Sequence, residues 1–171
     1  MAEFAETLEH LSRRGALLAG LALVVVAQPA MSRPRPVPRV LFICQYGTAK
    51  SAIARELFRR RARQRGVAVA AFSRGLTLAD HISPPLRQKL SADGIDPAAD
   101  YATVLARRDW QYADLVVAFN PLPKDIRPTN LRDWSDLGSL NDDYANARPE
   151  LDRRIEALLD AFAKADRQVS P

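Results

Sequence analysis

The clearest structural pattern in this chain is the segment Val40-Leu41-Phe42-Ile43-Cys44-Gln45-Tyr46-Gly47-Thr48-Ala49-Lys50-Ser51. A continuous apolar run ends at Cys44, and such a run is typical of a central strand that is buried on both faces. A loop follows, and Lys50 and Ser51 begin a stretch with helical spacing. The segment therefore places a thiol beside the backbone N–H groups of a helix N-terminus, where anions bind and a thiolate is stabilised.

The rest of the chain alternates helical and β-prone stretches. Helices are predicted at residues 50–65, 84–92, about 102–112, and in a C-terminal stretch that begins at Pro149. Strands are predicted at residues 40–43, 67–73, 115–119 and 131–134. This alternation predicts an α/β fold, a three-layer α/β/α domain with a four-stranded parallel sheet. Ligands bind beyond the carboxyl ends of such strands, where Cys44 and Asp136 are expected.

Residues 1–30 have the pattern of a secretory signal peptide. Arg13 and Arg14 precede an apolar run from Gly15 to Ala27, which is shorter than the roughly 20 residues of a membrane span. The arginine pair is similar to a twin-arginine signal. A Pro-rich linker at residues 31–38 then leads to a single domain at residues 39–167.

The signal pattern predicts a periplasmic or exported protein if residues 1–27 or 1–30 are cleaved, with no stable membrane insertion. Two alternatives stay open. The apolar run could remain as an anchor, or translation could start at Met31, the only other methionine, which would leave the protein in the cytoplasm.

The composition is that of a globular, basic protein. The 171 residues are 47% apolar, and 25 basic against 20 acidic residues give a net charge of +5. Five arginines fall in the predicted helix at 50–65: Arg59, Arg60, Arg61, Arg63 and Arg65. We interpret them as a solvated face, with steering of phosphorylated or acidic substrates as the alternative. No aromatic residues are interleaved with them, so no nucleic-acid partner is predicted.

The sequence favours no metal and no other cofactor. Cys44 is the only cysteine, which excludes an intramolecular disulfide and a relay of several cysteines. His10 and His81 are the only histidines, so a Cys/His metal site is not supported. Lys50-Ser51 lacks the glycines of a nucleotide-binding P-loop, which argues against NTP hydrolysis.

Residues 39–162 resemble the low-molecular-weight protein tyrosine phosphatase family, which shares its fold with thioredoxin-coupled arsenate reductases. The family has a Cys-x5-Arg-Ser/Thr loop after its first strand, and Cys44 to Ser51 follow that pattern with Lys50 at the arginine position. Other segments that resemble the family are Phe72-Ser73-Arg74-Gly75, Gly94-Ile95-Asp96 and Ala113-Asp114-Leu115.

The resemblance implies a role for each residue of the site. Cys44 would be the nucleophile, Ser51 would hydrogen-bond the sulfur, and Asp136 would protonate the leaving oxygen and then activate water. The phosphoryl oxygens would be held by the backbone amides of Gln45, Tyr46, Gly47, Thr48, Ala49 and Lys50.

The chain departs from the family pattern within this loop. Lys50 supplies a charge but not the planar fork of an arginine, which could cost about 2 to 4 kcal/mol in the transition state. Gly47 stands where the family has a bracing Asn, Tyr46 where it has Gly, and Leu137 where it has Pro. We therefore expect the loop to be braced by other residues.

Three functions stay open. The first is a cysteine-dependent phosphatase that acts on a phosphorylated protein or a small aryl phosphate. The second is a non-catalytic relative that binds phosphate or a similar oxyanion. The third is an arsenate reductase, which would need an external thiol donor because Cys44 has no cysteine partner. His81 is interpreted as a turn or surface residue, and Tyr46 and Tyr144 as candidates to contact an aromatic substrate.

Overall fold

A computed structural model describes residues 36–169, so the predicted signal segment at 1–30 and most of the 31–38 linker lie outside the described residues. The described part contains a four-stranded, all-parallel sheet with the order β2-β1-β3-β4. The strands are β1 (Arg39–Cys44), β2 (Ala70–Gly75), β3 (Leu115–Ala118) and β4 (Leu131–Asp133). The central position of β1 explains its continuous apolar sequence, as predicted.

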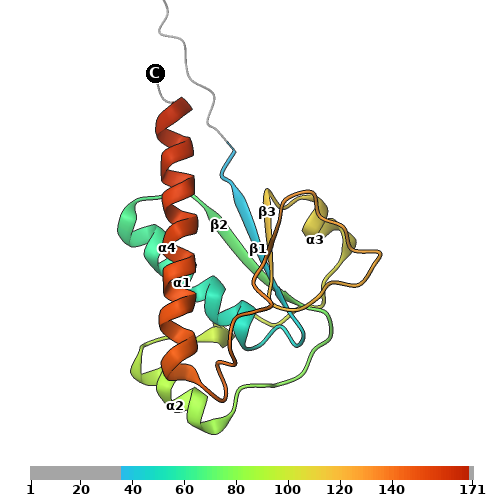
Figure 1. Cartoon of the computed structure of the whole chain (residues 1–171), viewed down its shortest axis with the longest axis vertical. Helices are drawn as coiled ribbons and strands as arrows, with labels where there is room; N and C mark the ends of the chain where they lie inside the picture. The colour runs from blue at the N-terminus through green and yellow to red at the C-terminus, as the bar shows by residue number, and fades with distance from the viewer. Residues whose placement is uncertain (1–35, 170–171) are drawn as a thin grey trace, which may run out of the picture. The chain divides into compact units, whose positions relative to one another are not determined.

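Helices cover both faces of the sheet, which confirms the three-layer α/β/α prediction (Figure 1). The helical elements are α1 (Lys50–Arg65), α2 (Pro84–Ala92), the 3₁₀ turn η1 (Pro97–Ala99), α3 (Arg107–Gln111) and α4 (Tyr144–Val169). Alternate residues of β1 point to opposite layers. Phe42 packs with the side chains of α1, α2 and α4, whereas Leu41 and Ile43 pack on the side of α3.

Three predicted elements begin three or more residues away from their observed starts, whereas the bounds of the others differ by one residue at most. The helix predicted at 102–112 is limited to α3 at Arg107–Gln111, because Val104 forms a β-bridge with Gly75 instead. The N–H of Gly75 donates to the Thr103 carbonyl, and the Gly75 carbonyl accepts the N–H of Leu105. The C-terminal helix begins at Tyr144, before Pro149. The second strand begins at Ala70 because the N–H of Val67 still donates to α1.

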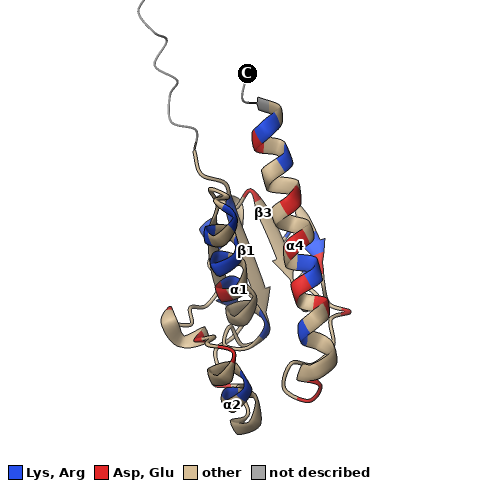
Figure 2. Cartoon of the chain, turned by 90° about the vertical axis from the view of Figure 1, so that its left-hand side faces the viewer, with Lys and Arg blue, Asp and Glu red and all other residues tan. Residues whose placement is uncertain are grey.

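Basic residues follow one another along α1, and acidic and basic residues alternate along α4 (Figure 2). Three of the five arginines in the α1 cluster form ion pairs. Arg61 pairs with Asp152 and Glu156 of α4, and Arg65 pairs with Glu156 and Asp160. Arg59 pairs with Asp100 at 2.6 Å. The interpretation of the cluster as a solvated face is therefore incomplete. The guanidinium groups of Arg59, Arg61 and Arg65 also join α1 to α4 and to the loop before α3. Among the described helices, none is long and apolar enough to cross a membrane.

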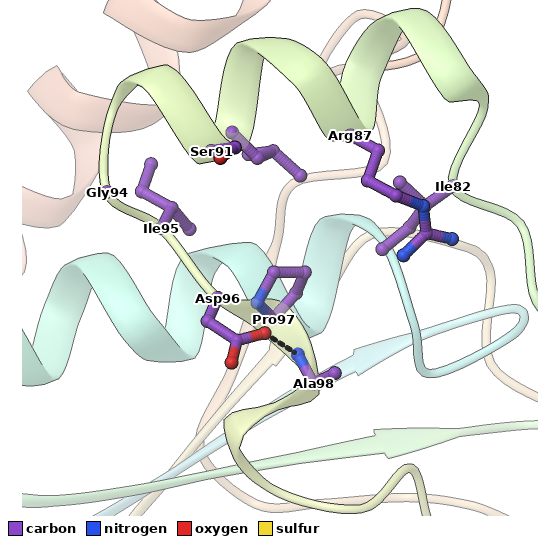
Figure 3. A pocket seen from close by; sticks show the side chains of 9 residues that line it. Ile82, Arg87, Ser91, Gly94, Ile95, Asp96, Pro97 and Ala98 are labelled. Atoms are coloured by element: carbon purple, nitrogen blue, oxygen red, sulfur yellow. Dashed lines mark hydrogen bonds between the residues drawn. The ribbon is translucent and has the colours of Figure 1, made fainter.

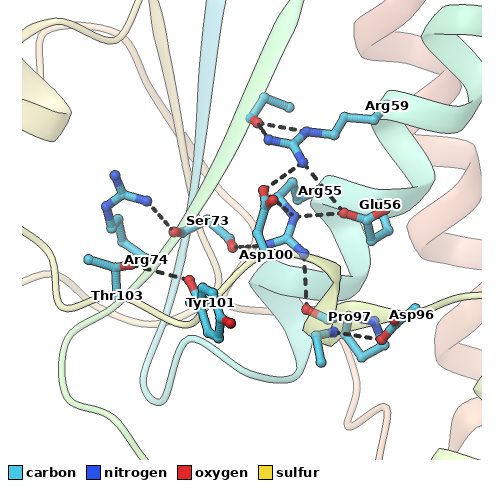
Figure 4. A network of polar contacts seen from close by, with 12 residues as sticks. Arg55, Glu56, Arg59, Ser73, Arg74, Asp96, Pro97, Asp100, Tyr101 and Thr103 are labelled. Carbon is cyan, nitrogen blue, oxygen red and sulfur yellow. Dashed lines mark hydrogen bonds and ion pairs between the residues drawn. The ribbon is translucent and has the colours of Figure 1, made fainter.

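Arg55 of α1 is buried, with 1% of its surface exposed, although no sequence pattern predicts its burial (Figure 4). Its three nitrogens donate to the Ser73 hydroxyl at 2.7 Å, the Pro97 carbonyl at 2.9 Å and the Glu56 carboxylate at 2.9 Å. A buried guanidinium is tolerated only when its donors are satisfied in this way. Arg55 thus ties α1 to β2 and to η1, behind the loop that follows β1.

Candidate active site

Cys44 lies at the carboxyl end of β1, at the sheet edge predicted for the site. Its sulfur is 3.0 Å from the Ser51 hydroxyl and accepts the backbone N–H of Gly47 at 3.2 Å. Only 5% of the cysteine is exposed. The structure thus brings Cys44 and Ser51 together, as the resemblance implied, with a loop amide pointing at the sulfur.

Helix α1 begins directly after this loop and has no side-chain cap. Ala49 occupies the N-cap position, and its side chain has no oxygen that could accept the N–H groups of the first turn. The uncapped start of a 16-residue helix leaves donors and the positive end of the helix dipole for an anion beside Cys44. The local geometry therefore supports the prediction of an oxyanion site.

The loop is braced by residues that the sequence did not single out. Asn120, two residues beyond β3, accepts the N–H of Gln45 through its side-chain oxygen at 2.9 Å. The N–H groups of Leu76 and Thr77 donate to the carbonyls of Cys44 and Gln45. Asn120 follows the third strand at the same sheet edge as Cys44. A polar residue just after a predicted strand could therefore have been identified as part of the site.

Two glycines allow the loop to approach the end of β2. Gly47 has a φ of +72°, and a Cβ there would lie 2.9 Å from the backbone nitrogen of Gly75. A Cβ on Gly75 would in turn lie 2.8 Å from the backbone nitrogen of Gly47 and 2.2 Å from the Thr77 carbonyl oxygen. Both positions exclude side chains, so the backbone of the loop can lie close to the backbone at the end of β2.

A pocket of about 230 Å³ opens beside the cysteine. Its lining residues come from the loop, the start of α1 and three later segments: Cys44, Gln45, Tyr46, Ala49, Lys50, His81, Asn120, Ser139, Leu140 and Asn141. The rings of Tyr46 and His81 pack at 4.6 Å between centroids. Asn141 holds the His81 segment in place, since its side chain donates to the His81 carbonyl and accepts from the Ser83 N–H.

Lys50 lines the pocket, but its ammonium group also contacts a later loop. The Nζ atom donates to the Leu137 carbonyl at 2.6 Å. Burial lowers the pKa of the Lys50 ammonium below its ordinary value of 10.5, while Cys44 and Asp136 oppose part of that change. Lys50 therefore supplies a positive charge near Cys44 and ties the start of α1 to the loop after β4.

Asp136 does not line the pocket. Its carboxylate accepts two hydrogen bonds from Arg154 of α4, at 2.8 and 2.6 Å. These bonds are the main reason why the pKa of Asp136 lies below its ordinary value of 3.8. Asp136 is thus paired with Arg154 and also lies close enough to the pocket-lining Lys50 for that charge to lower its pKa.

The pairing around Arg154 predicts a pH effect on stability. Arg153 and Arg154 lower the pKa of Glu150 to about 2, and Arg154 lowers that of Asp136. Carboxyls with lowered pKa values stabilise the fold above their unfolded pKa, and this contribution disappears as the pH falls through the folded value. Urea midpoints should therefore fall between about pH 5 and pH 2, and the fall should be smaller in Arg154→Gln. The control Lys164→Gln, also in α4, should show the same fall as the wild type. A fall in Arg154→Gln as large as the fall in that control would contradict the assignment.

Two other aromatic residues belong to the core. Tyr144 is 8% exposed and donates its hydroxyl to Asp93 at 2.6 Å, and burial is the first cause that raises its pKa to about 12. The suggestion that Tyr144 contacts a substrate ring is therefore wrong. Trp134 packs against Phe42 and Phe119, with centroids 6.3 and 5.7 Å away.

A second pocket, of about 390 Å³, lies between α2 and η1 (Figure 3). Its acidic residue, Asp96, caps η1 by accepting the N–H of Ala98 at 3.0 Å. Its basic residue, Arg87, pairs with Asp80. The lining contains no nucleophilic thiol, so the smaller pocket beside Cys44 is the better candidate for catalysis. Within residues 36–169, no cluster of three or more His, Cys, Asp or Glu side chains is arranged to hold a metal ion.

Comparisons with solved structures show the same fold in several bacterial proteins. A low molecular weight protein tyrosine phosphatase from Bacillus subtilis has 21% identity and a TM-score of 0.58, with 75% of this chain and 99% of that protein covered. The YwlE arginine phosphatase from Geobacillus stearothermophilus has 20% identity and a TM-score of 0.58, with coverages of 78% and 98%.

A thioredoxin-dependent arsenate reductase from Corynebacterium glutamicum has 25% identity and a TM-score of 0.56, with 77% of this chain and 64% of that protein covered. No curated protein matches the chain. The family described as low molecular weight phosphotyrosine protein phosphatase matches residues 39–168, which include all strands of the described part of the chain and the whole Cys44 loop. With this match over most of its length, the chain belongs to that family.

Proposed function

We propose that this chain is a cysteine-dependent phosphatase that acts on phosphorylated proteins or small aryl phosphates through a phosphocysteine intermediate. The observation that carries the proposal is the placement of the Cys44 sulfur, 3.0 Å from the Ser51 hydroxyl and 3.2 Å from the Gly47 nitrogen, at the uncapped start of α1. Phosphatases in the family and among the structural neighbours support the reaction class.

The geometry supports a two-step reaction. The Cys44 thiolate attacks phosphorus, an S–P bond forms, and the P–O bond to the leaving group breaks. Free amides at the start of α1 and the Lys50 charge stabilise the phosphoryl oxygens. Water then attacks phosphorus, the S–P bond breaks, and the Ser51 hydroxyl donates a hydrogen bond to the departing thiolate.

The experiment is a rapid acid quench of the full-length protein with an aryl phosphate. Peptide mapping should find the phosphoryl group on Cys44, and phenol should be released in a burst that equals the amount of phosphoenzyme. Steady hydrolysis without any phosphocysteine would contradict the proposal.

Two contacts favour a second candidate, an oxyanion-binding protein with little turnover. Lys50 donates to the Leu137 carbonyl and Asp136 is held by Arg154, so neither is poised on a bound phosphoryl group in this state. Phosphate binding measured by calorimetry, together with no aryl phosphate turnover, would select this candidate. Production of arsenite from arsenate that depends on an added thiol would instead select the reductase activity, for which the Corynebacterium neighbour is the precedent.

A further inference from the structure

The turn that follows β4 borders the pocket of about 230 Å³. The N–H of Leu137 donates to the Trp134 carbonyl at 3.0 Å and closes this turn, which carries Asp136. The carbonyl of Leu137 accepts a hydrogen bond at 2.6 Å from the pocket-lining Lys50. Two residues that follow the turn line the pocket themselves: Ser139 and Leu140. Asp136 is therefore adjacent in sequence to a residue that contacts the pocket wall directly.

One side chain of α4 holds this turn. The Nη1 and Nη2 atoms of Arg154 donate to the two carboxylate oxygens of Asp136 at 2.8 and 2.6 Å, and its Nε donates to Glu150 at 2.6 Å. The guanidinium carbon also lies 5.8 Å from the centroid of the Trp134 ring. Because the three guanidinium nitrogens are engaged and the next residue of α4, Ile155, is fully buried, the orientation of Arg154 is fixed.

The pair leaves part of the Asp136 carboxylate available to water. An ionised carboxylate has about four lone-pair sites, and Arg154 donates one hydrogen bond to each oxygen. The Asp136 side chain is 70% exposed, so water can reach the remaining sites. A carboxylate that is oriented by a guanidinium and open to water can accept a proton from it.

We propose that Arg154 is a positioning residue for the hydrolysis of the phosphocysteine, in which it holds the Asp136 carboxylate oriented to take a proton from the attacking water. This role rests on the proposed phosphatase function. In this step the water oxygen bonds to phosphorus, the S–P bond breaks, and Cys44 departs as a thiolate. One proton of the water goes to Asp136, which later releases it to solvent or to the leaving oxygen of the next substrate. The products are inorganic phosphate and free enzyme, and no other reactant is needed.

The charges that face Asp136 come from three elements. Arg154 of α4, which Glu150 shares, is the main cause that lowers the Asp136 pKa, and Lys50 of α1 adds to the effect. The carboxylate of Asp133, at the end of β4, interacts with Asp136 in the opposite sense. A base works above its pKa, so the loss of Arg154 should move the acid limb of the kcat profile to higher pH. Cys44 carries the phosphoryl group in this step and does not titrate.

Steady-state kinetics with p-nitrophenyl phosphate test this role, because nitrophenolate departs without a proton. In Arg154→Gln, kcat should fall about 10-fold or more, since the phosphocysteine is hydrolysed more slowly. The ratio kcat/KM, which reports formation of the phosphocysteine, should change less than about 3-fold. The acid limb of kcat should move to higher pH. Arg154→Lys keeps the charge and should recover part of the loss in kcat.

Two further variants separate this role from a structural one. The matched control is Arg153→Gln, because Arg153 is the adjacent residue of α4, is 70% exposed and pairs with Glu150. This variant should keep the wild-type kcat and kcat/KM. Asp136→Asn should show the same split between kcat and kcat/KM as Arg154→Gln, and adding Arg154→Gln to it should lower kcat no further.

Several outcomes would overturn the assignment. An equal loss of kcat and kcat/KM in Arg154→Gln would indicate that Arg154 only supports the fold of the site. A further fall of kcat in the double variant would show that Arg154 acts independently of Asp136. Wild-type kcat in Arg154→Gln, in an enzyme whose turnover depends on Cys44, would refute the positioning role and leave the phosphatase function standing. Absence of Cys44-dependent turnover in the wild type would overturn both.

Discussion

Replacing Cys44 with serine should lower kcat/KM for aryl phosphates by at least about 10⁴-fold, because the variant loses the nucleophile while the rest of the site stays in place. A serine hydroxyl is a much weaker nucleophile than a thiolate at neutral pH. The hydrogen-bond donors at the start of α1 do not depend on the sulfur. The variant should therefore still bind inorganic phosphate within a few-fold of the wild-type affinity.

Two measurements on the same preparation check this result. Turnover is followed with p-nitrophenyl phosphate, and phosphate binding by calorimetry, which also shows that the variant is folded. Residual turnover above about 1% of wild type would place the nucleophile elsewhere. Loss of phosphate binding would mean that Cys44 shapes the loop through its contacts with Ser51 and Gly47.

Replacing Arg55 with alanine should lower the free energy of unfolding by about 3 to 5 kcal/mol. Arg55 is 1% exposed, and its loss leaves the Ser73 hydroxyl and the Pro97 carbonyl without their donor. It also opens a cavity between α1 and β2. Urea unfolding followed by far-UV circular dichroism measures the change.

Two companion variants separate the contributions. Arg63→Ala changes an exposed arginine on the same helix and should stay within about 0.5 kcal/mol of wild type. Arg55→Met fills most of the volume without donating hydrogen bonds, so it should still be destabilised by about 1 to 3 kcal/mol. Wild-type stability in Arg55→Met would contradict a contribution from the hydrogen bonds.

The segment from β1 to α1 could be predicted because its signals are local. An apolar run fixes a central strand, and Gly66 ends α1 in the left-handed conformation with a φ of 64°. The residues after Asp100 could not be predicted in the same way. Their extended form depends on hydrogen bonds to Gly75, which is distant in sequence and lies at the sheet edge.

The residues of the candidate site likewise differ in how far they could be predicted, according to whether their contacts are local in sequence. Cys44, Lys50 and Ser51 lie within one short segment, so their proximity follows from the strand, loop and helix alone. The brace from Asn120 joins residues 75 apart in sequence, and the pair between Asp136 and Arg154 joins residues 18 apart. Such contacts depend on how the elements pack, which no local pattern encodes.

The contact between Gly47 and Gly75 bears on how much sequence change this site can tolerate. The main chain of the loop approaches the end of β2 so closely that a Cβ on either glycine would collide with backbone atoms of the other. Mutational scanning should therefore find Gly47 and Gly75 intolerant of any residue that carries a side chain.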